Sequence, residues 1–334
     1  MAFISAISYY TPEHRLTNDM LIERYPDGDI VKTEQVTGIK NRYIAAENEF
    51  SSDLAVKASE KLFTEYNIDR STVDFVIVCT QTPDYYLPST SCIVQNALGL
   101  STKTGALDIN MGCSGYVYSL GVAKGMVDTS VAKNLLLITV DIFSKFIHPR
   151  DKANQVIFGD AATATLVTAG KGLFQLNDFV FGTDGSGAGN LIIKEGAGRN
   201  FKKTFEERTD EYGNVLCDSY LYMNGNNVFS FTIQSVPVLV RDVIEKNGTS
   251  LDEVDHFIFH QANNFILEYL RKKIKIPAEK FIRNIEGVGN TTSSTIPLAF
   301  KDAMNAGAFK TGQKVLLVGY GVGFSWAGAI VTAS

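Results

Sequence analysis

Two pairs of segments along the chain repeat the same order of amphipathic and apolar residues. Residues 54–81 have the pattern of an amphipathic helix, an acidic loop and an apolar strand, and residues 238–261 have this pattern again. Residues 111–141 have the pattern of a turn, a helix and a buried strand, which residues 290–321 repeat at nearly the same offset. Because the period is about half of the chain, the pattern indicates a duplicated α/β domain and not a solenoid.

The strands of this repeat are continuous apolar runs and not alternating ones. Such runs are typical of parallel sheets that helices cover on both faces. We therefore predict an α/β fold with two related halves, residues 1–172 and residues 173–334. The four apolar runs are Phe75–Val78, Leu135–Val140, Phe257–Phe259 and Val315–Val318.

The uncharged stretch 315–334 has the length that a membrane-spanning helix needs. Glycines interrupt it, however, and two of them flank Val322. Two buried strands joined by a glycine loop explain this pattern better than a spanning helix. The N-terminus shows neither a basic leader nor a long apolar segment. We therefore expect neither a membrane segment nor a signal peptide.

Composition narrows the classes of function. The chain has 334 residues and a net charge of −5, which argues against nucleic-acid binding because phosphate contacts need clustered Lys and Arg. The four cysteines lie far apart and form no CxxC pair, so we expect neither a disulfide framework nor a metal site. This use of cysteine suggests a reducing compartment, and we predict a cytoplasmic protein.

Cys113 lies where an apolar strand ends and a helix with many small residues begins. A thiol at a buried helix N-terminus meets unpaired backbone N–H groups and the positive end of the helix dipole, and both favour the nucleophilic thiolate. Cys113 is therefore a candidate nucleophile. A buried structural cysteine is the alternative as long as this feature is taken alone.

His260 and Asn290 are candidates from the second half. His260 follows a buried strand and opens the polar sequence His-Gln-Ala-Asn-Asn. Ligands of open α/β sheets bind at the carboxyl ends of strands, although a structural histidine is the alternative. Asn290 lies in a polar turn before an apolar helix, and helix capping is the better explanation for this residue alone.

A glycine loop, Gly319–Gly323, follows the last of the four apolar runs. The loop lacks the GxxxxGK[ST] sequence of a phosphate loop and a GxGxxG sequence before a helix, so we do not expect nucleotide binding. Glycine lets a backbone approach a reacting carbonyl closely. We expect Gly321, Val322 and Gly323 to form part of an oxyanion hole.

Nine motifs, taken together and in order, resemble those of β-ketoacyl-acyl-carrier-protein synthase III, a branch of the thiolase superfamily. The resemblance covers nearly the whole chain and implies a thiolase-like fold, with the duplicated halves in five αβαβα layers. The motifs are Thr37–Ala45, Leu87–Gly99, Gly112–Gly115, Ile157–Val167, Asp184–Gly187, Tyr222–Phe229, His260–Asn263, Gly289–Ala299 and Gly319–Gly328.

The resemblance implies a role for each of the three candidates. Cys113 would accept an acyl group from an acyl thioester. A malonyl group on acyl carrier protein would then lose carbon dioxide while His260 and Asn290 stabilise the enolate, and the carbanion would attack the acyl-cysteine. The resemblance further implies no cofactor, acyl-coenzyme A or acyl-carrier phosphopantetheine as substrates, and a homodimer in which the Leu87 loop reaches the partner's acyl tunnel.

Several positions depart from the family's pattern. Lys32 and Val36 stand where members that use a coenzyme A primer carry Trp and Arg, and Phe265, after Asn264, stands where an Arg contacts the carrier. The other departures are Leu87 for Phe, Val322 for Gly and Lys152 for Arg. We expect weak thioester or carrier contacts at Lys32, Lys152, Asn264 and Phe265. We also expect an acyl donor other than acetyl-coenzyme A, such as one on a dedicated carrier protein.

Other functions within the superfamily stay open. Hydroxymethylglutaryl-coenzyme A synthase relies on a glutamate base, and the corresponding stretch here offers only Asp84. Ester-forming, amide-forming and head-to-head condensing relatives of specialised metabolism are alternatives that the sequence does not exclude. A non-catalytic partner that shapes another subunit's tunnel usually lacks the active cysteine, which this chain keeps.

Overall fold

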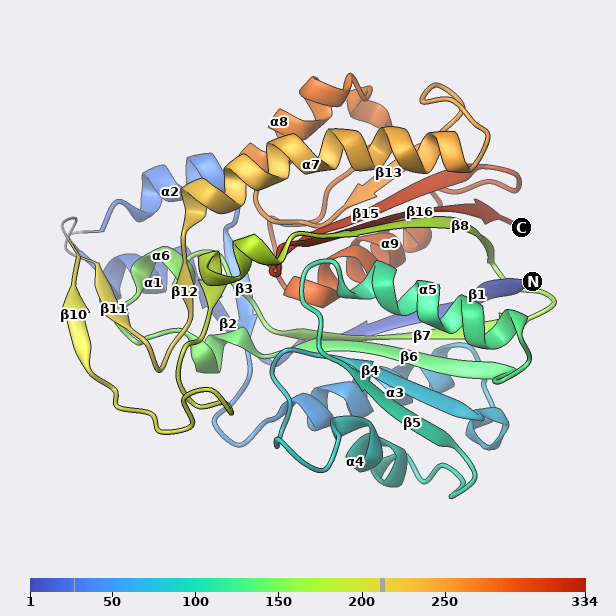
Figure 1. The fold of residues 1–334 in the computed structure, drawn as a ribbon, viewed down its shortest axis with the longest axis horizontal. Coiled ribbons are helices and arrows are strands. Elements are labelled where there is room, and N and C mark those ends of the chain that lie inside the picture. Colours follow the sequence, from blue (N-terminus) through green and yellow to red (C-terminus); the bar gives the residue numbers. More distant parts are fainter. Residues whose placement is uncertain (27, 211–213) are drawn as a thin grey trace.

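A ten-stranded sheet runs through the whole protein. The computed structural model describes residues 1–26, 28–210 and 214–334 (Figure 1). Along the sheet the strands follow the order β14-β13-β15-β16-β8-β1-β7-β6-β4-β5. Their bounds are β1 (Ala2–Tyr10), β4 (Phe75–Cys79), β5 (Gly105–Ile109), β6 (Asn134–Asp141), β7 (Ala161–Ala169), β8 (Phe174–Thr183), β13 (His256–Phe259), β14 (Phe281–Ile282), β15 (Lys314–Gly321) and β16 (Ser325–Ala333).

The two ends of the sheet have the same topology. β4 pairs in parallel with β5 and β6, and β13 pairs in parallel with β14 and β15. β6 and β15 then pair antiparallel with β7 and β16. At the centre β1 and β8 pair with each other and join the two half-sheets. This symmetric order confirms the duplication that the sequence predicts.

Helices cover both half-sheets and share a middle layer (Figure 1). α3 and α4 pack on the outer face of the first half-sheet, and α7 and α8 cover the outer face of the second. α5 and α9 lie between the half-sheets, and α5 contacts strands of both. The result is the expected five-layer αβαβα arrangement. The bounds are α3 (Ser51–Glu65), α4 (Thr90–Ala97), α5 (Gly115–Asp128), α7 (Gly225–Lys246), α8 (Asn264–Ile274) and α9 (Thr295–Asn305).

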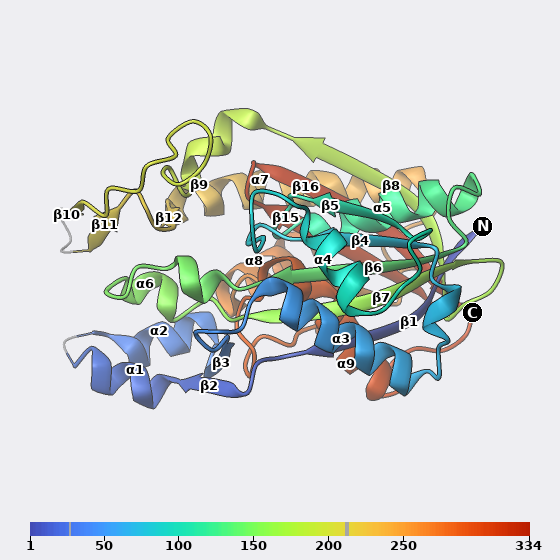
Figure 2. The ribbon, with the colours of Figure 1, turned by 90° about the horizontal axis from the view of Figure 1, so that it is seen from below.

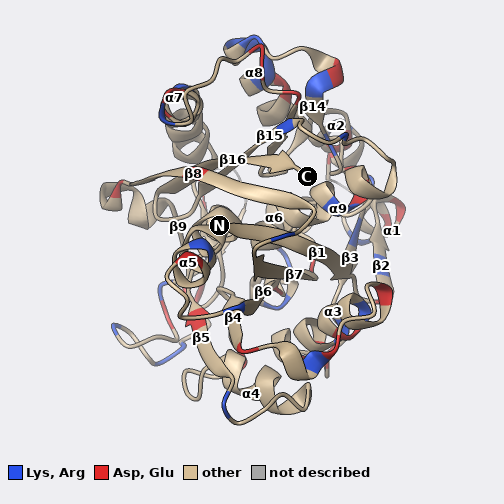
Figure 3. Ribbon diagram, turned by 90° about the vertical axis from the view of Figure 1, so that its right-hand side faces the viewer, with Lys and Arg blue, Asp and Glu red and all other residues tan. Residues whose placement is uncertain are grey.

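The middle layer lies in the largest part of the core. Tyr116 and Leu120 of α5 and Phe300 of α9 are fully buried and pack with Ile77 and Leu317 from the two half-sheets. Charged residues lie mainly on the outer helices and loops, and the strands are mostly uncharged (Figure 3). Burial of apolar surface between the half-sheets therefore holds the two halves together.

The parallel pairing predicted from the four apolar runs is confirmed, because β4 pairs in parallel with β6 and β13 with β15. The strands between these pairs are antiparallel, which the runs did not indicate. β1, β7, β8 and β16 pair antiparallel with their neighbours. β15 and β16 are joined by residues 322–324 alone, and so short a loop allows only an antiparallel pair. Helices still cover both faces, which explains the continuous apolar runs.

The uncharged stretch 315–334 forms the predicted pair of buried strands, β15 and β16. Among the described residues no helix has the length and hydropathy to cross a membrane. The predicted boundary at residues 172 and 173 lies in the turn between β7 and β8. Both this division into domains and the cytoplasmic location stay predictions.

Shorter elements gather at one end of the sheet (Figures 1 and 2). The turn between β15 and β16 and the beginning of α5 face this end (Figure 1). These peripheral elements are β2 (His14–Thr17), α1 (Asn18–Arg24), α2 (Ile30–Thr37), β3 (Asn41–Ile44), α6 (Lys152–Gln155), β9 (Leu191–Ile192), β10 (Glu207–Thr209), β11 (Val215–Cys217) and β12 (Tyr222–Met223).

Five short 3-10 helices complete the described secondary structure. They are η1 (Arg70–Thr72), η2 (Phe143–Phe146), η3 (Gly185–Asn190), η4 (Ala278–Lys280) and η5 (Thr292–Ser294). η5 leads directly into α9 and follows Asn290 by one residue. This turn therefore opens the middle layer in the second half, as the Cys113 turn does in the first.

Candidate active site

Cys113 lies in the turn between β5 and α5, two residues before the helix begins at Gly115. The side chain is 7% exposed. A Cβ atom at the preceding residue, Gly112, would lie 2.3 Å from Gln81 Oε1 and 2.9 Å from Val322 Cγ1. The turn is therefore held tightly between the loop after β4 and the β15–β16 hairpin.

The β15–β16 hairpin closes over the Cys113 sulfur. A Cβ atom at Gly321 would lie 2.9 Å from Cys113 Sγ and 2.7 Å from Cys113 Cβ, so only glycine leaves room for the thiol. The backbone of Val322 hydrogen-bonds to the sulfur. Gly323 packs against Ser325 instead. Of the three loop residues predicted from the sequence, Gly321 and Val322 thus contact Cys113.

The expectation that Cys113 favours the thiolate is wrong for this environment. Burial raises the pKa of Cys113 to about 12, and the nearby Asp141 carboxylate acts in the same direction. Backbone hydrogen bonds from Val322 and from Cys113 itself oppose this shift. Removal of the sulfur from water therefore outweighs the donors at the start of the helix, and the resting group at neutral pH is the thiol.

His260 directly follows β13 and is 2% exposed. Its Nδ1 lies 2.7 Å from Thr295 Oγ1, and its backbone N–H donates to Val318 O over 2.8 Å. Burial lowers the pKa of His260 to about 3, and a backbone hydrogen bond to Thr292 opposes this shift. The imidazole is therefore neutral at physiological pH and can act as a hydrogen-bond donor without a charge.

Asn290 is buried in the turn before η5, with 5% of its surface exposed. Its backbone N–H donates to Ile157 O over 2.9 Å, and its carbonyl accepts from Gly159 N over 3.1 Å. The side-chain Oδ1 accepts from Thr292 N over 2.9 Å, as in a short turn closed by Asn. The side-chain amide NH₂ therefore remains as the donor that Asn290 can offer to a ligand.

Tyr320 and Thr292 link the three candidates. The Tyr320 ring lies edge-on to His260 with the ring centroids 5.5 Å apart, and its hydroxyl donates to His260 O over 3.2 Å. Burial raises the pKa of Tyr320, and the charge of Cys113 adds to this effect, which places Tyr320 beside the thiol as well. Thr292 bonds to Asn290 Oδ1 and lies against His260. Cys113, His260 and Asn290 therefore surround one site between the halves.

Comparison with known proteins agrees with this geometry. Residues 107–185 match the family model of 3-oxoacyl-[acyl-carrier-protein] synthase III, and residues 244–333 match the model of its C-terminal part. A β-ketoacyl-[acyl-carrier-protein] synthase III from Clostridium perfringens is 34% identical over 323 residues, which are 96% of each chain. The chain belongs to the β-ketoacyl-acyl-carrier-protein synthase III family.

Other synthase III proteins are similar over the full length. The protein from Campylobacter fetus is 36% identical, and the match covers 99% of this chain and 98% of that protein. A crystal structure of a 3-oxoacyl-(acyl-carrier-protein) synthase III superposes with a TM-score of 0.96 at 46% identity and covers 99% of both chains. The chain is thus an acyltransferase of the ketoacyl synthase type with a thiolase-like fold.

The residues at which we expect thioester or carrier contacts lie on α2, α6 and α8. Lys32 on α2 has a side chain that is 75% exposed, and its Nζ lies 3.6 Å from Asp29. Phe265 on α8 is 52% exposed, whereas the neighbouring Asn264 packs against Gly38 after α2. Lys152 is the first residue of α6. The structure brings α2 and α8 together, but the thioester contacts of these residues stay predictions.

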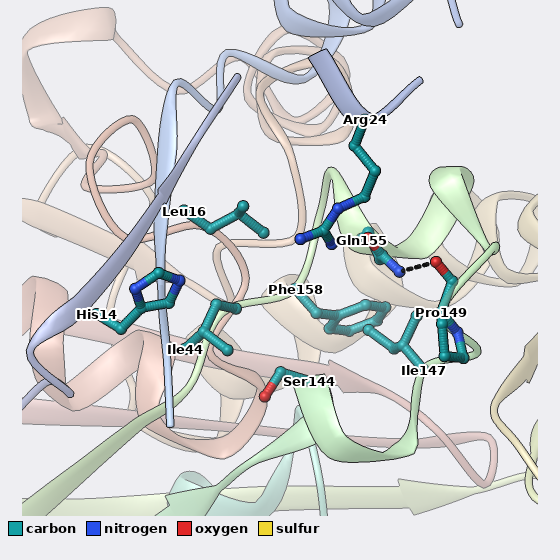
Figure 4. Close-up of a pocket in the computed structure, with 9 residues that line it drawn as sticks. All are labelled: His14, Leu16, Arg24, Ile44, Ser144, Ile147, Pro149, Gln155 and Phe158. Carbon is teal, nitrogen blue, oxygen red and sulfur yellow. Dashed lines mark hydrogen bonds between the residues drawn. The ribbon is translucent and has the colours of Figure 1, made fainter. Parts of the chain in front are cut away.

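A cavity of about 230 Å³ is lined by residues of β2, β3, α1 and α6 and of the segment between β6 and α6 (Figure 4). Phe158 lines the cavity, and its backbone forms a parallel bridge with Asn290. None of the three candidates lines this cavity, so it is separate from the synthase III site. Its lining residues are His14, Leu16, Arg24, Ile44, Ser144, Ile147, Pro149, Gln155 and Phe158.

Sequence reasoning missed Asp141, which the structure places beside Cys113 and against the 292–293 turn. Asp141 ends β6, and Gly321 ends β15. The two strands match at a spacing of 180 positions (141 and 321), so the repeat contained a signal for Asp141. Its equivalence in the repeat to Gly321, together with its bonds to Thr292 and Ser293, assigns Asp141 to the same site.

Proposed function

We propose that the protein catalyses a decarboxylative condensation of an acyl primer with malonyl-acyl-carrier protein. One observation carries this proposal: the buried Cys113 thiol lies under the Gly321–Val322 backbone while the neutral His260 and the Asn290 amide face the same site. This set offers a nucleophile, N–H donors for an oxyanion and two uncharged donors for an enolate.

The first step is transfer of the acyl group to Cys113. The sulfur attacks the carbonyl carbon of an acyl thioester, a new carbon–sulfur bond forms, and the old one breaks. The thiol proton of Cys113 ends on the released thiol, so the step uses up one thioester and one thiol and forms one of each. Backbone N–H groups at Cys113 and Val322 hold the developing oxyanion. Because the resting group is a thiol, its proton has to leave as the sulfur attacks.

The second step is loss of carbon dioxide from the malonyl thioester. The electron pair of the broken carbon–carbon bond becomes an enolate, whose oxygen accepts hydrogen bonds from His260 Nε2 and the Asn290 amide. For Nε2 to donate, Nδ1 has to accept the Thr295 hydroxyl proton, which the 2.7 Å contact permits. The carbanion then attacks the acyl carbon, and the Cys113 thiolate leaves and takes up a proton.

The partners in this proposal are acyl carrier protein and an acyl thioester, with no resident cofactor. The phosphopantetheine arm of the carrier or of coenzyme A brings each acyl group to Cys113. Val36 is 50% exposed, Lys32 is engaged with Asp29, and Phe265 is 52% exposed. An apolar rim where a coenzyme A clamp is expected supports a carrier-bound donor over acetyl-coenzyme A.

We also propose that the protein works as a homodimer. Leu87 is 82% exposed, and its neighbours Tyr85 and Tyr86 are 63% and 79% exposed. Three successive large apolar side chains in water are unfavourable, and a partner subunit would cover them. A dimer mass in light scattering, and a monomer for Leu87→Glu, would support this assembly; a monomeric wild type would contradict it.

Single-turnover experiments with wild-type enzyme test the proposed reaction. Acyl donors on coenzyme A and on carrier protein are offered one at a time, and the mass added to Cys113 is read by intact mass spectrometry. Malonyl-carrier protein is then added, and carbon dioxide and the 3-oxoacyl product are measured. An acyl adduct without carbon dioxide release would contradict decarboxylation, and equal acylation by acetyl-coenzyme A would contradict the carrier-bound donor.

A further inference from the structure

Asp141 is fully buried at the end of β6 and accepts four hydrogen bonds. Its Oδ1 accepts from Gln81 N over 2.8 Å. Its Oδ2 accepts from Thr292 Oγ1 over 2.5 Å, from Ser293 Oγ over 2.5 Å and from Ser293 N over 3.2 Å. All four donors are uncharged, and three of them belong to the other half of the molecule.

These contacts connect Asp141 to both parts of the site. The side chain of Gln81 packs against Gly112, the residue directly before Cys113. Thr292 donates its backbone N–H to Asn290 Oδ1, so fixing Thr292 fixes the orientation of the Asn290 amide. Asp141 therefore lies between the nucleophile turn and the turn with the second enolate donor.

The same turn also reaches His260. Thr295 Oγ1 lies 3.1 Å from Thr292 O and 2.7 Å from His260 Nδ1. Its one hydroxyl proton can go to only one of these two acceptors, and the proposed mechanism requires that it goes to Nδ1. A shift of η5 would therefore move Thr295 and could transfer the ring proton of His260 from Nε2 to Nδ1. Both proposed enolate donors depend on the position of a turn that Asp141 holds.

The repeat supplies an independent observation. At the spacing of 180 positions, Asp141 matches Gly321 and Ser293 matches Cys113. Gly321, from the second half, packs against Cys113, and Asp141, from the first half, contacts Ser293. At the first contact the Cys113 thiol meets a glycine, which has no side chain. At the equivalent contact in the other half, the Asp141 carboxylate accepts a hydrogen bond from the Ser293 hydroxyl.

We infer that Asp141 is a positioning residue, which clamps the 292–293 turn so that Asn290 and His260 point their donors at the enolate. This inference rests on the proposed function, because it assigns Asp141 to the decarboxylation step and not to acyl transfer. It contacts no reacting atom and acts through Thr292 and Ser293.

A separate electrostatic effect distinguishes this role from a merely structural one. Asp141, Tyr320 and the neutral His260 are titratable groups at the site of Cys113, and after burial the Asp141 charge helps to raise the pKa of Cys113. Loss of the charge should therefore make Cys113 more reactive at a fixed pH, although loss of the clamp makes decarboxylation slower. General damage to the fold would lower both rates.

The test uses Asp141→Asn in the full-length protein and a malonyl-N-acetylcysteamine probe. The amide keeps the size of the side chain, but in either orientation its NH₂ group faces a backbone N–H, that of Gln81 or that of Ser293, and two donors cannot bond to each other. We expect kcat for carbon dioxide release to fall by about 100-fold with KM changed by less than about threefold. Alkylation of Cys113 by iodoacetamide, followed by intact mass spectrometry, should become faster at the same pH.

Two neighbouring serines give a matched control. Ser293→Ala removes a bond to Asp141 and should lower kcat by about tenfold. Ser294→Ala removes bonds to Thr139 Oγ1, Thr139 O and Ala161 O, none of which involves Asp141, and kcat should stay within about twofold. Equal losses in the two serine variants, or unchanged carbon dioxide release in Asp141→Asn, would overturn the inference.

A separate measurement distinguishes failure of the proposed reaction from failure of the inference about Asp141. If wild-type protein releases no carbon dioxide, the proposed reaction is wrong whatever the variants do. The clamp is then judged by hydrogen exchange of the peptide covering residues 290–295, which should increase in Asp141→Asn and Ser293→Ala but not in Ser294→Ala. Unchanged exchange in both clamp variants would remove the inference on its own.

Discussion

The two halves of the protein have one backbone plan and different chemistry. At the spacing of 180 positions, Cys113 in the first half matches Ser293 in the second, and Thr80 matches His260. The paired residues lie at equivalent places, directly before the middle helices or directly after the parallel strands. A duplicated fold thus offers each position twice. The candidate nucleophile Cys113 occupies one copy of the first position, and His260 occupies one copy of the second, in the opposite half.

The comparison also explains why only one of the two matched turns carries a candidate nucleophile. Over Cys113 the crossing residue is Gly321, which leaves the sulfur in contact with backbone N–H groups. Over Ser293 the crossing residue is Asp141, whose carboxylate holds the hydroxyl at 2.5 Å. The first arrangement places no side chain above the sulfur, whereas the second uses the equivalent place to fix a turn.

The largest effect is expected for the nucleophile and its counterpart. Cys113→Ala should form no acyl adduct and lose condensation by about four orders of magnitude or more, because no other atom takes the sulfur's place. Intact mass spectrometry after incubation with an acyl thioester measures this. Ser293→Ala should keep the adduct, as should Cys92→Ala, which removes an exposed thiol. An adduct on Cys113→Ala would show that another group is the nucleophile.

The next largest effect is expected for His260 and its counterpart Thr80. His260→Ala should slow carbon dioxide release by about 100- to 1000-fold, since it removes one of two donors to the enolate. Thr80→Ala changes the equivalent position in the first half, where the hydroxyl accepts from Thr82 N over 3.0 Å, and should keep nearly full activity. Comparable losses in both variants would mean that the halves contribute alike, against the division of labour proposed here.

The pH dependence of Cys113 tests which influence on the thiol prevails. Because burial raises its pKa to about 12, the thiolate fraction should increase about tenfold for each pH unit from neutral pH upwards. Iodoacetamide alkylation should therefore accelerate by about 100-fold over two pH units without a plateau. A plateau between neutral pH and the ordinary pKa of cysteine would show that the helix N-terminus outweighs burial.

The smallest effects compare two glycines. Gly321→Ala places a methyl group against Cys113 Sγ and should slow acylation by about tenfold or more, measured by the rate of adduct formation. Gly125 lies on the exposed face of α5, and a Cβ there would meet no atom within 4 Å. Gly125→Ala should leave acylation unchanged and stabilise the protein by about 0.5–1 kcal/mol in chemical denaturation.

Much of the fold could be predicted because the hydrophobic pattern repeats. The apolar runs at Leu135–Val140 and Val315–Val318 lie inside β6 and β15, and the last stretch forms two strands. The runs predicted the parallel pairs β4–β6 and β13–β15 but not the antiparallel strands beside them, since burial on both faces gives the same residues to either direction. The antiparallel inner strands follow from loop lengths and from pairing between distant segments.

The candidate site was predictable where side chain and local context agreed. Cys113, His260 and Asn290 lie together as the motifs indicated. The pKa of Cys113 was not predictable from the helix N-terminus, because the opposing effect is burial by the other half of the chain. Asp141 was missed for the same reason, since its bonds to Thr292 and Ser293 join residues far apart in the sequence.

The shared middle layer has a consequence for the assembly of the chain. α5 belongs to the first half and α9 to the second, yet the core around them includes residues of both half-sheets. A chain cut in the exposed turn around residues 170–173 would give two fragments, each with one face of its half-sheet open to water. Neither fragment should fold alone, but the two together should reassemble, so this enzyme behaves as one folding unit built from two interlocked copies.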